Sequence, residues 1–140
     1  MESRTKALLA FYAVATVVFG CATTSLVPTP TEQVMAALTE LQAGWKTGDA
    51  DRIAGTYSDD YIGAAGDKSG LRAFFEGYAA QGLLQLTQVG IGECKVVTDG
   101  DSATAGPVHY DAAAGRQSWS YTMRREADGV WRLIGDEQLY

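Results

Sequence analysis

The hydrophobic pattern of the chain changes its period once, near Leu83, and this change restricts the fold more than any other feature. Before Leu83, apolar residues recur three and four positions apart, as they do on one face of an α-helix. From Leu83 onward they alternate with polar residues, as in β-strands with one buried face. A chain with helices first and strands second is expected to fold as an α+β domain, in which helices cover one face of an antiparallel sheet.

The first helix is expected to begin at Pro30, because proline favours the first helical position. Thr29 precedes it and Glu32 follows, and this Thr-x-x-Glu spacing is a capping box. Gly48 ends the pattern, as glycine commonly does after a helix C-terminus. The apolar stripe of this helix consists of Val34, Leu38, Leu41 and Trp45.

Two further helices are expected before Leu83. Asp49 can cap a short second helix, since aspartate is a preferred N-cap residue. Ser69 is the expected N-cap of a third helix that ends near Gly82. The apolar face of the third helix consists of Leu71, Phe74, Phe75 and Tyr78.

Four mostly antiparallel strands are expected in the second part of the chain. The turn pairs Asp99-Gly100 and Asp128-Gly129 are typical of tight hairpins. Gly90 and Gly92 are the expected bend points of the first strand. The expected strands cover residues 83–97, 102–111, 117–123 and 130–139.

Residues 1–20 have the pattern of a secretory signal peptide. Arg4 and Lys6 lie in a short charged segment, and the run from Ala7 to Phe19 that follows is almost entirely apolar. As a helix this run would rise about 20 Å, which is too short for the ~30 Å hydrocarbon core of a membrane. It has the length of the apolar region of a signal peptide instead. We therefore expect the protein to be exported.

The end of the apolar run, Val18-Phe19-Gly20-Cys21, resembles the bacterial lipoprotein signal. The resemblance implies cleavage before Cys21, a lipid on its thiol, and a tether over residues 21–30 that leads to a domain at residues 31–140. The membrane is thus an expected partner. Ala22 in place of Asp implies the outer membrane, facing the periplasm, where the host has two membranes. The alternative is cleavage after Ala22, which would give a secreted soluble protein.

The charges and the scarcity of metal-ligating residues exclude several classes of function. The chain has 11 basic and 17 acidic side chains, a net charge of −6, and removal of residues 1–20 leaves 9 − 16 = −7. Nucleic acid is not an expected partner, because Arg124-Arg125 is the only adjacent basic pair. One histidine, His109, and two cysteines, Cys21 and Cys94, cannot supply a zinc set. No metal and no cofactor are expected.

Four short motifs occur in order between residues 31 and 140: Trp45-Lys46-Thr47-Gly48-Asp49, Tyr57-Ser58-Asp59-Asp60-Tyr61, Asp99-Gly100-Asp101-Ser102-Ala103 and Asp128-Gly129-Val130-Trp131-Arg132-Leu133. With these motifs the sequence resembles the nuclear transport factor 2-like superfamily, which includes SnoaL-like and ketosteroid-isomerase-like domains. The resemblance implies a cone-shaped, cystatin-like fold, with three helices packed in the concave face of a curved sheet and a pocket at the open end. It also implies a homodimer formed through the outer face of the sheet. The fold hosts isomerases, dehydratases, hydrolases and non-catalytic domains, so it does not by itself identify a reaction.

Six side chains are the candidates for lining such a pocket: Trp45, Tyr57, Tyr61, Tyr78, His109 and Trp131. Tyrosine suits a pocket because it joins an apolar ring to a hydrogen-bonding hydroxyl. Histidine is the usual acid–base residue near neutral pH. Strict strand alternation places His109 on the same inward face as Ala105. It also places Glu137 on the same face as Trp131, from which it can point at a cavity. His109 and Glu137 are therefore the candidates for catalysis, as base and orienting group.

No complete catalytic set of the enzymatic relatives can be placed on this sequence. The leading interpretation is a membrane-anchored, non-catalytic domain that binds a small apolar ligand or a protein partner. The first alternative is an isomerase, hydrolase or dehydratase of small molecules that uses His109 with Glu137. The second is a structural homodimer: Trp119 and Tyr121 alternate with small hydroxyl residues, so one face of that strand is a candidate dimer surface.

Overall fold

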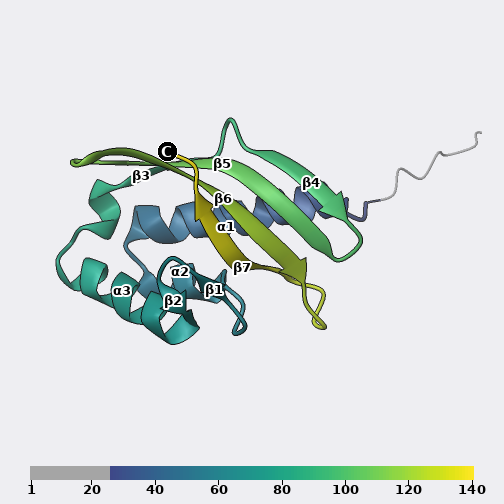
Figure 1. The fold of residues 1–140 in the computed structure, drawn as a ribbon, viewed down its shortest axis with the longest axis horizontal. Helices are drawn as coiled ribbons and strands as arrows, with labels where there is room; N and C mark the ends of the chain where they lie inside the picture. The colour runs from purple at the N-terminus through teal and green to yellow at the C-terminus, as the bar shows by residue number, and fades with distance from the viewer. Residues whose placement is uncertain (1–25) are drawn as a thin grey trace, which may run out of the picture.

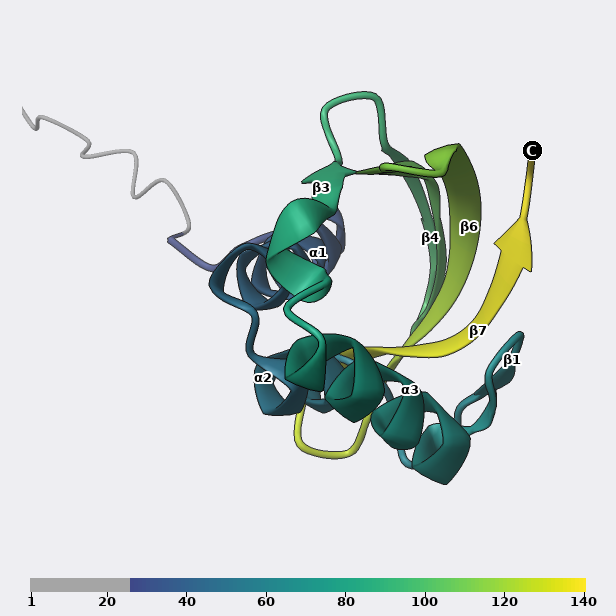
Figure 2. The ribbon, with the colours of Figure 1, turned by 90° about the vertical axis from the view of Figure 1, so that its left-hand side faces the viewer.

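A computed structural model describes residues 26–140 of the protein (Figure 1). The predicted signal peptide, Cys21 and the first part of the tether lie outside the described residues. The described chain consists of three α-helices on the concave side of a curved antiparallel sheet, which Figure 2 shows nearly edge-on. The α+β class and the cone-like arrangement of helices and sheet are confirmed. No helix within residues 26–140 is long and apolar enough to cross a membrane.

Helix α1 (Pro30–Thr47) begins and ends where its local signals predict. The side chain of Thr29 accepts a hydrogen bond from the Glu32 amide, and the Glu32 carboxylate accepts one from the Thr29 amide. Gly48 follows with a φ of 70°, a left-handed conformation that glycine adopts without steric cost. Its buried face comprises Val34, Leu38, Leu41, Gly44 and Trp45.

The next two helices are short and are capped by aspartates. Helix α2 (Ala50–Gly55) follows Asp49, whose side chain accepts a hydrogen bond from the Arg52 amide. Helix α3 (Lys68–Ala80) begins before the expected Ser69, because the Asp67 carboxylate accepts from the Gly70 amide over 2.9 Å and caps the helix there. A two-stranded hairpin, β1 (Ile62–Gly63) and β2 (Gly66–Asp67), connects the α2 region to α3.

The main sheet has five strands, one more than expected: β3 (Gln88–Gly90), β4 (Lys95–Asp99), β5 (Ser102–Ala112), β6 (Gly115–Arg125) and β7 (Trp131–Gln138). Their order is β3-β5-β6-β7, and β4 pairs with the same edge of β5 as β3 does. The single strand expected over residues 83–97 is instead a 3₁₀ turn (Leu84–Leu86), then β3, then β4. The chain leaves the sheet after Gly90, at one of the predicted bend points, and returns at Lys95.

Two β-bulges change which residues face the helices. In β5, Ala105 pairs with Tyr121 but Val108 pairs with Trp119, so β5 has one extra residue between the two pairs. In β7, Leu133 pairs with Met123 but Gly135 pairs with Thr122, so β7 also gains one residue. Because side chains alternate along a strand, each extra residue exchanges the inward and outward positions beyond it.

The hydrophobic core lies between α1 and the concave face of the sheet. The sheet contributes to it Ala103, Ala105, Val108, Tyr110, Tyr121, Met123, Trp131 and Leu133. The inward residues of β5 are thus 103 and 105 before its bulge, but 108 and 110 after it. Beyond the second bulge, β7 likewise turns even-numbered residues toward the helices.

Candidate ligand-binding site

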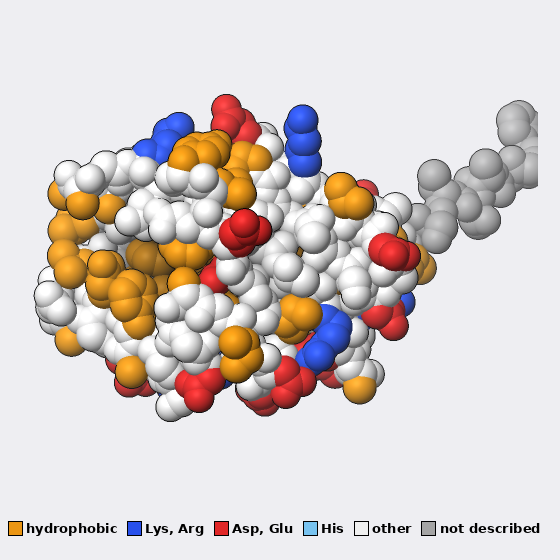
Figure 3. All heavy atoms as spheres, viewed as in Figure 1, with side chains coloured by type: hydrophobic (Ala, Val, Ile, Leu, Met, Phe, Trp, Pro, Cys, Tyr) orange, Lys and Arg blue, Asp and Glu red, His pale blue; other side chains and the backbone are white. Residues whose placement is uncertain are grey.

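A cavity of about 480 Å³ opens between α3 and the concave face of the sheet. Figure 3, in the orientation of Figure 1, shows hydrophobic side chains gathered in a hollow at this place. Nine aromatic residues line it: Trp45, Tyr57, Tyr61, Phe74, Phe75, Tyr78, Tyr110, Trp119 and Tyr121. They come from α1, the segment after α2, α3, β5 and β6, so the whole fold contributes to the walls.

The aromatic walls are packed against one another. The rings of Tyr57 and Tyr61 meet edge to face, with centroids 5.0 Å apart and an interplanar angle of 87°. Trp45 and Phe75 pack in the same way, at 5.5 Å and 89°. Edge-to-face packing is a favourable arrangement of aromatic rings, and packed rings have few alternative rotamers. The cavity is therefore preformed.

Buried tyrosine hydroxyls form the polar part of the inner wall. The hydroxyls of Tyr110 and Tyr121 are 2.6 Å apart, which is a hydrogen bond in which either can donate. Burial raises the pKa of Tyr57, Tyr110 and Tyr121, because an ionised phenol loses its hydration there. These phenols thus keep their protons, and the member of the Tyr110–Tyr121 pair that accepts from the other has its own proton left to donate.

Asp136 supplies the charge of the site. It is the only charged side chain among the cavity-lining residues within 26–140. Its Oδ2 accepts a hydrogen bond of 2.5 Å from the Tyr61 hydroxyl, and its Oδ1 accepts one of 2.8 Å from the Ala64 amide. Burial and the neighbouring Asp136 raise the pKa of Tyr61, so the phenol keeps its proton and donates a hydrogen bond to the carboxylate. Gly63 fits beside this pair only because it lacks a side chain: an added Cβ would lie 2.3 Å from the Tyr61 hydroxyl oxygen.

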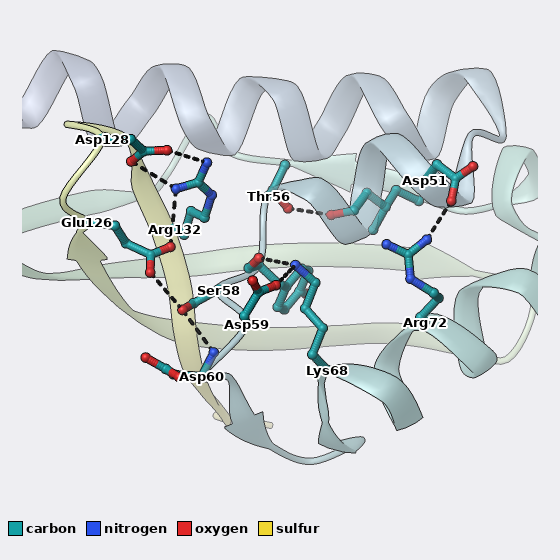
Figure 4. Close-up of polar contacts among 12 residues, drawn as sticks. Asp51, Thr56, Ser58, Asp59, Asp60, Lys68, Arg72, Glu126, Asp128 and Arg132 are labelled. Atoms are coloured by element: carbon teal, nitrogen blue, oxygen red, sulfur yellow. Dashed lines mark hydrogen bonds and ion pairs between the residues drawn. The ribbon is translucent and has the colours of Figure 1, made fainter.

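A polar network next to the cavity holds the segment that carries Tyr57 and Tyr61 (Figure 4). The Lys68 ammonium donates to the Tyr57 carbonyl over 2.7 Å and also contacts Asp59 at 3.1 Å. The hydroxyl of the fully buried Ser58 donates to the Glu126 carboxylate over 3.1 Å. The backbone of this segment is also bonded to β7, where the Ser58 amide donates to the Leu133 carbonyl. These contacts fix the two tyrosines relative to the sheet.

Four of the six side chains expected in the pocket line the cavity: Trp45, Tyr57, Tyr61 and Tyr78. Their role in binding stays a prediction. Trp131 does not line it. Its ring is buried in the core ahead of the second bulge, and its Nε1 donates to the Gln33 side chain over 3.0 Å.

His109 does not line the cavity either, and the expected inward orientation is wrong. The bulge between Ala105 and Val108 turns Tyr110 inward and His109 to the outer face of the sheet. There its Nδ1 lies 2.7 Å from Ser118 Oγ and its Nε2 lies 2.7 Å from a Glu93 carboxylate oxygen. This order of serine, histidine and acid resembles a catalytic triad, but Ser118 is fully buried, so a substrate cannot reach its hydroxyl.

Glu137 is exposed on the outer face because β7 also contains a bulge. Beyond the bulge in β7, Glu137 pairs with Ser120 and points away from the cavity, whereas Asp136 points into it. Strand β6 lies between His109 and Glu137, so they do not occupy neighbouring strands. Asp136 was not among the site residues predicted from the sequence. The one signal for it was the adjacent apolar pair Leu133-Ile134, which interrupts the alternation as a bulge does.

Metal-ligating side chains are dispersed over the described part of the chain. No group of three or more His, Cys, Asp or Glu residues within 26–140 is arranged to hold a metal ion. Cys94, a free cysteine in the loop between β3 and β4, is partly buried, and burial raises the pKa of its thiol. This environment disfavours the thiolate, which is the reactive form.

Comparison with known proteins identifies the fold. No protein-family model matches the sequence, and no curated protein matches it. Among solved structures, a nuclear transport factor 2-like protein of unknown function from Pseudomonas putida aligns with a TM-score of 0.65 and 17% identity, over 77% of this chain and 84% of that one. A nuclear transport factor 2-like protein with a cystatin-like fold from Novosphingobium aromaticivorans aligns with a TM-score of 0.59 and 20% identity, over 76% and 79%. An uncharacterised protein with a cystatin-like fold from Caulobacter vibrioides aligns with a TM-score of 0.62 and 16% identity, over 77% and 87%. The chain therefore has the cystatin-like fold of nuclear transport factor 2-like proteins.

Proposed function

We propose that the domain binds a small, largely apolar molecule in the cavity between α3 and the sheet, without converting it. The observation that carries this proposal is the preformed aromatic cavity of about 480 Å³. Most binding sites for small molecules are concave and apolar, with a few polar groups that orient the ligand. This cavity has that composition: nine aromatic walls, the paired hydroxyls of Tyr110 and Tyr121, and one carboxylate.

Fluorescence of N-phenyl-1-naphthylamine, a neutral probe that brightens in apolar surroundings, tests the proposal. Ala64 is an exposed turn residue that lines the cavity, so a tryptophan there can occupy it at little cost to the fold. We expect saturable binding to the wild type and a loss of about tenfold or more in affinity in Ala64→Trp. Ala127→Trp is the matched control, because Ala127 is exposed in the β6–β7 turn and is not part of the cavity wall. Equal binding by both variants would reject the cavity as the site.

A second candidate function is acid–base catalysis in the same cavity, with Asp136 in the role first assigned to His109. The observation that favours it is a carboxylate and tyrosine hydroxyls facing one apolar space, where an acid and a base can act on one substrate. Incubation of a bound ligand with the protein, followed by mass spectrometry, distinguishes the two. Recovery of unchanged ligand supports binding alone, whereas conversion that is lost in Asp136→Asn supports catalysis.

We further propose that the mature protein is exported and anchored by a lipid on Cys21, with the domain beside the membrane. The pattern of residues 1–20 and the four residues that end at Cys21 support this proposal. Mass spectrometry of the membrane fraction should find an acylated N-terminal cysteine, and Cys21→Ser should leave the protein unacylated and uncleaved. A soluble protein that begins at Thr23 would instead establish the alternative cleavage.

A homodimer through the outer face of the sheet is the remaining proposal about assembly. Val97, Thr104, Thr122 and Gly135 are successive cross-strand partners there and form an uncharged row. Val97 is 67% exposed, so this row presents an apolar side chain to a partner. Light scattering should give twice the mass of the chain, and Val97→Lys should give the monomer. A monomeric wild type at high concentration would reject the dimer.

A further inference from the structure

We infer that the ligand of the cavity carries a positively charged group, such as an ammonium, which lies against Asp136, and that the cavity discriminates against carboxylates. This inference rests on the proposed binding function and specifies the chemical class of the ligand. It follows from the electrostatics of the wall rather than from its shape.

Asp136 has no cationic partner among the described residues. Nine ion pairs between arginine or lysine and a carboxylate occur within residues 26–140, and every arginine of that range takes part in at least one of them. Asp136 is in none of these pairs, although it is partly buried in an apolar wall. A partly buried carboxylate without a counter-ion is unfavourable, because it loses hydration and gains no opposite charge. A cationic ligand would supply the missing partner.

The carboxylate also has acceptor capacity left over. Each oxygen of Asp136 receives one hydrogen bond, Oδ2 from the Tyr61 hydroxyl and Oδ1 from the Ala64 amide. A carboxylate oxygen has two lone pairs, so each can accept one more hydrogen bond. The two protein donors hold the group in place and leave these positions for an N–H donor of the ligand.

The rest of the wall favours a cation and offers nothing to an anion. No lysine, arginine or histidine lines the cavity among the described residues, so a bound carboxylate would face Asp136 without compensation. Nine aromatic residues line the cavity, and aromatic rings attract cations to their faces through their quadrupoles. The net charge of −6 adds a field of the same sign.

A matched set of fluorescent ligands tests the inference. 1-Pyrenemethylamine, 1-pyrenemethanol and 1-pyreneacetate share one apolar body and differ in charge, and their binding to the full domain can be followed by fluorescence anisotropy. In the wild type at pH 7 we expect the ammonium to bind about tenfold more tightly than the alcohol, and the carboxylate to bind more weakly than both. Equal affinities for the ammonium and the carboxylate in the wild type would overturn the inference without any variant.

Two variants separate Asp136 from the general acidity of the surface. Asp136→Asn should remove most of the preference for the ammonium over 1-pyrenemethanol, and saturable binding of 1-pyrenemethanol to this variant would show that the cavity is intact. Glu137→Gln removes the same charge from the next residue, on the outer face, and should keep the preference. A preference that survives in Asp136→Asn would overturn the inference while the binding function stands. Failure of all three compounds to bind would instead reject the binding function itself.

Discussion

The hydroxyl of Tyr61 donates a 2.5 Å hydrogen bond to the carboxylate of Asp136, across a separation of 75 residues in the sequence. The bond joins the segment after α2 to β7 at the wall of the cavity. Asp136 also accepts from the Ala64 amide, so it holds the β1–β2 hairpin to the sheet. Tyr61 is fully buried, and loss of its partner would leave its hydroxyl without an acceptor in the protein.

The coupling between these two residues can be measured with a double-mutant cycle. We expect Tyr61→Phe to lower the free energy of unfolding by about 1–2 kcal/mol and Asp136→Ala by about 2–3 kcal/mol, because charged acceptors make stronger hydrogen bonds. The double variant should lose less stability than the sum of the two single losses, and the difference should be at least about 1 kcal/mol, as is typical of residues in contact. Urea unfolding at pH 7 provides the values. Additive losses would mean that the hydrogen bond contributes little to stability.

Gly63 should tolerate substitution poorly, in contrast to a glycine of α3. A Cβ at Gly63 would lie 2.3 Å from the Tyr61 hydroxyl oxygen and 2.5 Å from Asp136 Oδ1, so Gly63→Ala must displace the hairpin or the pair. We expect a loss of about 1–3 kcal/mol of stability, from overpacking. Gly77→Ala is the control, because Gly77 lies inside α3 with open space around the added Cβ, and it should stabilise by about 0.5–1 kcal/mol.

The buried tyrosines predict a loss of stability in alkaline solution. Burial raises the pKa of Tyr57, Tyr61, Tyr110 and Tyr121 above the ordinary value, so the unfolded chain releases these protons at lower pH than the folded protein does. Stability from this source is complete below about pH 10 and is lost as the pH rises above that value. Absorbance at 295 nm, which reports phenolate, should rise together with the loss of far-ultraviolet circular dichroism. In Tyr110→Phe the pH dependence should be shallower, and phenolate formation without unfolding would contradict the prediction.

The helices could be predicted from the sequence because their boundaries depend on nearby residues. Thr29 and Glu32 cap α1 through bonds that span three positions, and Asp49 caps α2 in the same way. The error at α3 is of the same local kind: Asp67 and Ser69 are both capping residues, and the carboxylate two positions earlier is the one that bonds the first turn.

The faces of the strands could not be predicted in the same way, because a bulge depends on pairing between strands. The register of β5 against β6 decides that Val108 pairs with Trp119, and residues 102–112 by themselves do not fix that register. Pro107 was the local hint, since proline cannot donate a ladder hydrogen bond and is found at bulges. One extra residue in β5 replaced His109 by Tyr110 in the cavity wall, and one in β7 replaced Glu137 by Asp136.

Substitution of His109 tests this consequence of the bulge. His109→Ala should destabilise the protein, because it removes the hydrogen bonds to Ser118 and to Glu93 on the β3–β4 loop and leaves the buried Ser118 hydroxyl without that partner. The expected loss is about 1–3 kcal/mol in urea unfolding. Its affinity for N-phenyl-1-naphthylamine should equal that of the wild type, since His109 does not line the cavity. Tyr110→Phe serves as the comparison, because Tyr110 follows His109 in the strand and faces the cavity. It removes a hydroxyl of the inner wall, so it should lower the affinity for 1-pyrenemethanol, whose hydroxyl can bond there. If His109→Ala weakened binding as much as Ala64→Trp while the protein remained folded, the assignment of Tyr110 rather than His109 to the site would be wrong.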